Sequence, residues 1–62
     1  MEKYRIVFRG FGITRILIET PRFNEFMDAL IKFMIEYKDR EIKHSSHYDE
    51  LSDSLVNVVE IL

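Results

Sequence analysis

Residues 20–38 read TPRFNEFMDALIKFMIEYK, and this stretch decides the fold because its apolar side chains recur at helical spacing. The recurring positions, at steps of three and four residues, are Phe23, Phe26, Leu30, Phe33 and Tyr37. Four more apolar residues widen the same face: Met27, Ile31, Met34 and Ile35. The pattern predicts an amphipathic helix. Its apolar face is wider than one small β-hairpin can cover.

Thr20 and Pro21 predict where this helix begins. A Thr hydroxyl can accept a hydrogen bond from a free helix amide, and Pro needs no donor at the first helical position. We expect the helix to continue to about Lys38. Its solvated face carries Glu25, Asp28, Lys32 and Glu36.

Upstream of the helix, apolar and polar residues alternate over 3–9 and again over 13–20, which is typical of half-buried strands. Gly10 and Gly12 flank Phe11 and tolerate positive φ, so the chain can reverse tightly between the two strands. The sequence therefore predicts a β-hairpin. Its expected inner face consists of Tyr4, Ile6, Phe8, Ile16 and Ile18, and its outer face carries Arg5, Arg9 and Arg15 around Val7 and Leu17.

The segment downstream of the helix allows two interpretations. Residues 39–43 form a charged connection, with a short extra strand through Ile42 as an option. Ser46-x-x-Asp49 resembles a capping box, and the apolar residues behind it follow helical steps: Tyr48, Leu51, Leu55, Val58 and Leu62. We expect a second, C-terminal helix. The alternative is a third strand over 55–62, where β-branched residues are frequent.

The whole chain, 1–62, is predicted to be a single compact α+β domain that forms a homodimer. Folding a chain of this length buries roughly 6,600 Å², and the apolar part, somewhat over half, contributes about 95 kcal/mol against roughly 93 kcal/mol of conformational entropy. The monomer is therefore close to balance. With no Cys for a disulfide and only two His for a metal site, self-association is the stabilising option that remains.

Composition indicates a folded protein of the cytoplasm. Hydrophobic residues make up 47% of the chain and charged residues 32%, unlike a disordered segment. No stretch approaches the ~18 apolar residues of a membrane span, and the first residues lack the apolar core of a signal peptide. The absence of Cys fits a reducing compartment. We expect no cofactor and no membrane partner.

Residues 9–16 partly resemble the ribonucleoprotein octamer of RNA-recognition motifs, which begins K/R-G-F/Y-G/A. Arg9, Gly10, Phe11 and Gly12 match, whereas the aromatic positions that follow are Ile. The chain is too short for the βαββαβ arrangement of that family, so the two glycines are interpreted as a hairpin turn.

Two other clusters contain residue types that occur in active or metal sites. His44 and His47 lie near Asp49 and Glu50, but zinc sites of this size normally use Cys or a further His. Ser45, Ser46, His47 and Asp49 include the residue types of a hydrolytic triad, yet chain neighbours rarely form one. We therefore predict neither a metal site nor catalysis.

The favoured function is a non-enzymatic protein-binding protein, inhibitor or adaptor-like, that blocks or occupies a surface of another protein. Small phage-encoded inhibitors of host or defence proteins are similar in size and composition, as an analogy only. The candidate interface residues are Phe11, Leu17, Ile31, Met34 and Ile35. The alternative is a small nucleic-acid-binding protein that uses Arg5, Arg9 and Arg15, although a net charge of −2 makes nucleic acid the less favoured partner.

Overall fold

Two β-hairpins, separated in the chain by one helix, form a single sheet in the computed structural model, which describes residues 2–62. The elements are β1 (Lys3–Gly10), β2 (Ile13–Thr20), α1 (Phe23–Glu36), β3 (Ile42–Asp49) and β4 (Ser54–Ile61). The strand order is β2-β1-β4-β3. Each hairpin is antiparallel, whereas β1 and β4 pair in parallel at the centre of the sheet. The predicted small α+β fold is thus confirmed.

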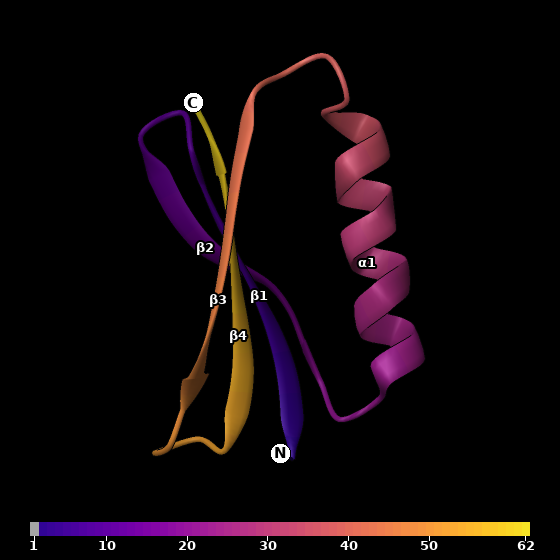
Figure 1. Cartoon of the computed structure of the whole chain (residues 1–62), viewed down its shortest axis with the longest axis vertical. Coiled ribbons are helices and arrows are strands. Elements are labelled where there is room, and N and C mark those ends of the chain that lie inside the picture. Colours follow the sequence, from indigo (N-terminus) through magenta and orange to yellow (C-terminus); the bar gives the residue numbers. More distant parts are fainter. Residues whose placement is uncertain (1) are drawn as a thin grey trace.

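The helix lies against one face of the sheet, and the other face is open (Figure 1). The core between the two layers contains Ile6 and Phe8 of β1, Phe26 and Phe33 of α1, and Val59 and Ile61 of β4. Aromatic rings join the layers directly. The Tyr4 and Phe26 rings stack with centroids 5.2 Å apart, and Phe8 meets Phe33 edge-on at 5.8 Å. The predicted inward faces of the first strand and of the helix are confirmed.

The predicted second helix is wrong, because the C-terminal part of the chain forms the hairpin β3–β4 instead. Asp49 does not cap a helix. Its carboxylate accepts hydrogen bonds from the Leu51 amide (3.2 Å) and the Ser52 hydroxyl (2.9 Å), and these bonds close the turn between the strands. Leu51, expected on an apolar helix face, is fully exposed. The strand alternative for the last residues is the correct one.

A β-bulge in the first hairpin changes which side chains of β2 face the helix. Ile6 pairs with Ile18, but Val7 pairs with Ile16, so Leu17 is an extra residue in β2. Because of this extra residue, the side chains of β2 that precede the bulge point to the faces opposite to those predicted. Ile16 therefore lies on the open face, where it is 56% exposed, and Arg15 lies on the helix side. The predictions that Ile16 lies on the inner face and that Arg15 and Leu17 lie on the outer face were therefore wrong.

The helix begins two residues later than predicted and ends at Glu36. Thr20 still stabilises the helix start, although it lies outside the helix. Its Oγ1 accepts a hydrogen bond from the Arg22 amide (3.1 Å) and donates one to the Glu25 carboxylate (2.7 Å). Glu25 also binds Arg22 at 2.6 Å, and these contacts hold its pKa below the ordinary value of 4.5. A negative charge in the first turn is favourable there.

Candidate interaction surfaces

The helix leaves the edge strand β3 largely uncovered on the sheet face on which it lies. The α1 backbone approaches β1 and β2, and its buried side chains also pack against β4 in the core. Alternation along β3 places His44, Ser46 and Tyr48 on the helix side, and all three are exposed. Leu55 of β4 lies opposite Tyr48 in the register and is partly buried. The helix side of β3 is therefore accessible to a partner.

The flank of α1 that faces away from β2 lies on the side of the uncovered strand β3. Large apolar residues repeat along this flank at helical spacing, and three of them are strongly exposed: Phe23 (53%), Ile31 (49%) and Ile35 (64%). Met27 and Met34 lie between them and are partly buried against the core. We call this area the helix-flank surface, which consists of Phe23, Met27, Ile31, Met34 and Ile35 of α1 with Tyr48 and Leu55 of the sheet. Exposed apolar side chains gathered on one side of a protein mark candidate interaction sites.

A buried polar side chain lies at the inner boundary of this surface. Asn57 of β4 is 4% exposed, and its Oδ1 accepts a hydrogen bond of 2.9 Å from His44 Nε2. Its Nδ2 is buried and has no hydrogen-bond partner among residues 2–62. An unsatisfied buried donor costs free energy of about 1–3 kcal/mol. The centre of the sheet therefore carries a destabilising group next to the uncovered strand β3.

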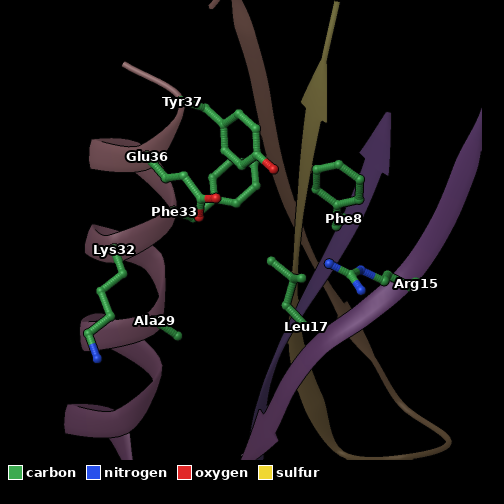
Figure 2. Close-up of a pocket in the computed structure, with 8 residues that line it drawn as sticks. All are labelled: Phe8, Arg15, Leu17, Ala29, Lys32, Phe33, Glu36 and Tyr37. Carbon is green, nitrogen blue, oxygen red and sulfur yellow. The ribbon is translucent and has the colours of Figure 1, made fainter. Parts of the chain in front are cut away.

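The opposite flank of α1 forms a cleft with the edge strand β2. The cleft has a volume of about 260 Å³. Its floor is apolar and consists of Phe8, Leu17, Ala29, Phe33 and Tyr37. Its charged residues are Arg15 on the strand side and Lys32 and Glu36 on the helix side (Figure 2). The Arg15 guanidinium carbon lies 5.8 Å from the centroid of the Phe8 ring.

Phe11 lies at the end of the first hairpin, close to this cleft. Phe11 (φ 53°) and Gly12 (φ 77°) form the turn, so the left-handed conformation falls on an aromatic residue as well as on a glycine. A side chain in that conformation costs about 1–2 kcal/mol. The Phe11 ring is nevertheless 61% exposed; it stacks 6.3 Å from Phe8, and Arg40 lies 5.1 Å above it. An exposed aromatic residue held at such a cost suggests a functional role.

The five predicted interface residues belong to these two separate surfaces. Ile31, Met34 and Ile35 lie on the helix-flank surface, whereas Leu17 lines the cleft and Phe11 lies beside it. Sequence reasoning did not propose Phe23 or Tyr48 as interface residues, and it placed Arg15 on the outer face of the hairpin as a candidate nucleic-acid contact. The spacing of Phe23 from Met27 and Ile31 was the signal available for Phe23, but nothing in the sequence marked the bulge that turns Arg15 into the cleft.

The three arginines of the nucleic-acid alternative do not share one surface. Arg5 and Arg9 lie on the open face of the sheet, and Arg15 lies on the helix side. Arg5 is also engaged in ion pairs, at 2.7 Å with Glu19 and 3.9 Å with Asp49. The hydrogen bond from Arg5 holds the pKa of Glu19 below its ordinary value. The hairpin therefore presents no continuous row of free cations.

The His-rich segment of β3 is likewise divided between two faces. His44 points to the helix side and pairs with Asn57, while His47 lies on the open face. Ser46 is separated from Ser45, His47 and Asp49 in the same way. Over residues 2–62, no group of three or more His, Asp or Glu side chains is placed to hold a metal ion.

Within the same residues, no helix has the length and apolar character that crossing a membrane requires. Comparisons of the chain with protein-family models, with curated proteins and with solved structures found no match.

Proposed function

We propose that this chain is a non-enzymatic protein-binding protein that works as a homodimer and occupies a surface of another protein, as an inhibitor or adaptor does. One observation carries the proposal. The helix-flank surface exposes about half or more of Phe23, Ile31 and Ile35, on the side of the sheet where the exposed strand β3 has no helix over it. Exposed apolar area of this extent is what a protein interface removes from water.

The helix-flank surface also suits a second copy of the same chain. It combines a ridge of apolar side chains on α1 with the exposed helix side of β3, and a twofold axis would place the ridge of each protomer over β3 of the other. The helix side of the sheet would then be covered across all four strands, as two-layer packing favours. The cleft beside β2 lies on the other flank of α1 and stays free in such a dimer.

Sedimentation equilibrium of the purified chain tests this assembly. We expect a dimer at micromolar concentration, with a melting temperature that rises with protein concentration because dissociation is coupled to unfolding. Ile35→Glu should weaken the dimer at least about tenfold, since it places a charge in the apolar interface.

Ile16→Glu is the matched control. Ile16 is exposed to a similar degree (56%, against 64% for Ile35) but lies on the open face of the sheet. We expect this variant to remain dimeric. A folded monomer whose melting is independent of concentration, or a dimer that Ile16→Glu disrupts and Ile35→Glu does not, would contradict the proposed assembly.

A further inference from the structure

The outer edge of β2 has no strand paired with it within residues 2–62. β2 pairs only with β1, so the backbone amides and carbonyls on its other side have no strand beside them within residues 2–62. Natural edge strands are commonly protected by Lys, Pro, a short length, a β-bulge or an inward-pointing charge. β2 has eight residues with neither Lys nor Pro, and its bulge at Leu17 and inward Arg15 both lie at the cleft. Its residues 13–16 keep a regular register with β1 up to the bulge, and the side chains of Ile13 and Ile16 are about half exposed.

An extended chain that added to this edge would have every second side chain over the cleft, because side chains alternate between the two faces of a strand. The floor of the cleft is formed by apolar atoms of Phe8, Leu17 and Phe33, among others. Its volume of about 260 Å³ is smaller than most small-molecule sites, which begin at roughly 300 Å³. The space therefore suits an apolar side chain of a peptide better than a whole cofactor.

The excess of positive charge around the cleft favours peptides that carry an acidic side chain. Arg15 and Lys32 outnumber Glu36 there, and neither cation forms an ion pair within residues 2–62. The chain as a whole is acidic, with a net charge of −2, so this excess of positive charge is local. Arg15 lies against the Phe8 ring at the floor. In a bound strand, an acidic side chain two positions from the apolar side chain in the cleft lies on the same face and would reach the Arg15 guanidinium.

We infer that β2 and the adjacent cleft bind an extended segment of a partner protein by strand addition, with an apolar residue in the cleft and an Asp or Glu two positions away bound by Arg15. This inference rests on the proposed protein-binding function and names the chemistry of the partner. Backbone hydrogen bonds give affinity in strand addition, and the pockets for alternate side chains give specificity. Phe11, exposed at the end of the cleft, adds an aromatic contact for the bound segment.

Selection from a phage-displayed library of random linear 12-residue peptides on the immobilised full chain tests the inference. We expect the enriched peptides to share an apolar residue with Asp or Glu two positions from it. Fluorescence anisotropy of one enriched peptide should then show affinity reduced at least about tenfold by Arg15→Glu, as expected for a charged anchor. Replacing the acidic residue of the peptide by Lys should restore binding to Arg15→Glu.

Two further variants separate binding from folding. Phe11→Asn should weaken the peptide without lowering the melting temperature, because Asn tolerates the left-handed conformation of the turn. Arg9→Glu is the matched control, since Arg9 belongs to the same hairpin but lies on the open face. It should change the affinity by less than about twofold, because an exposed charge on the far face contributes little.

Several results would overturn the inference. These are failure to enrich any peptide, enriched peptides without the acidic residue, unchanged affinity in Arg15→Glu, or peptide-induced changes of NMR amide signals on the helix-flank surface rather than in β2. Competition by single-stranded oligonucleotide at physiological salt would assign the cleft to nucleic acid instead. Ile35→Glu distinguishes the two proposals. Loss of the dimer in Ile35→Glu with retained peptide binding would support both proposals. A protein that dimerises but binds no such peptide would contradict the strand-addition inference and not the proposed dimer.

Discussion

Asn57 shows how one side chain can work against the stability of the sheet that contains it. Its amide is buried in the central strand β4 with Nδ2 unpartnered. Replacing it by Val removes the unsatisfied donor and introduces a residue that suits a strand. His44, the partner of the amide, is exposed and can bind water instead.

We therefore expect Asn57→Val to raise the free energy of unfolding by about 1 kcal/mol. Urea unfolding at a single protein concentration measures the change. Ser46→Val is the control, because Ser46 pairs with Asn57 in the register but is exposed on the edge strand β3. Equal effects of the two substitutions would attribute the gain to strand propensity, and destabilisation by Asn57→Val would show that the amide contributes to the fold.

At the scale of the elements, two carboxylates tie neighbouring segments together and make stability depend on pH. Glu19 links β2 to Arg5 of β1, and Glu25 links α1 to Arg22 and Thr20. Both pKa values lie below the ordinary value of 4.5. The stabilisation is therefore complete above about pH 4.5 and is lost as the pH falls through the lower pKa of the folded protein.

The melting temperature should accordingly decrease on acidification below about pH 4.5. A series of thermal melts between neutral and acidic pH measures this decrease. In Glu19→Gln the pair with Arg5 is absent at every pH, so the same series should show a smaller acid-induced decrease. Parallel curves for the two proteins would mean that the Glu19 pair contributes nothing measurable.

The elements differ in how far their sequences determine them. The first hairpin and the helix were predictable because local signals coincide there, such as Gly12 in the turn and the spacing of Phe26 and Phe33. β4 was ambiguous because a central strand is buried on both faces. Its run of Val56, Val58 and Val59 has no period-two alternation and can also be read as a helix segment.

The candidate surfaces were predictable only in part, because they depend on tertiary arrangement. Exposed apolar residues such as Ile31 and Ile35 could be proposed from the excess width of the helix face. The cleft could not, because it depends on the bulge at Leu17 and on the strand order. These features place Arg15 beside Phe8 and α1 against an edge strand.

For the whole molecule, the decisive contact is the parallel pairing of β1 with β4. It joins the hairpin and helix at the beginning of the chain to the hairpin at its end. A two-stranded hairpin is marginal alone, so neither half should be stable without the other. Separate fragments 2–38 and 40–62 should each lack cooperative melting.

Mixed in equal amounts, these fragments should regain the circular dichroism of the intact chain and melt cooperatively. The complex should be less stable at low concentration because the linking peptide no longer raises the effective concentration. Circular dichroism over a dilution series measures the association. Cooperative melting of fragment 2–38 alone would contradict the assigned role of the central pair.

The same central pairing affects the newly made chain. On the ribosome, β1 is synthesised first, yet the strand that covers its inner edge is the last of the five elements to emerge. Until then the nascent hairpin β1–β2 exposes a pairing edge on each side. Two chains that meet during this interval can exchange their C-terminal hairpins, since β4 of either chain fits β1 of the other. From this topology we expect an intertwined dimer as a by-product of synthesis at high local concentration.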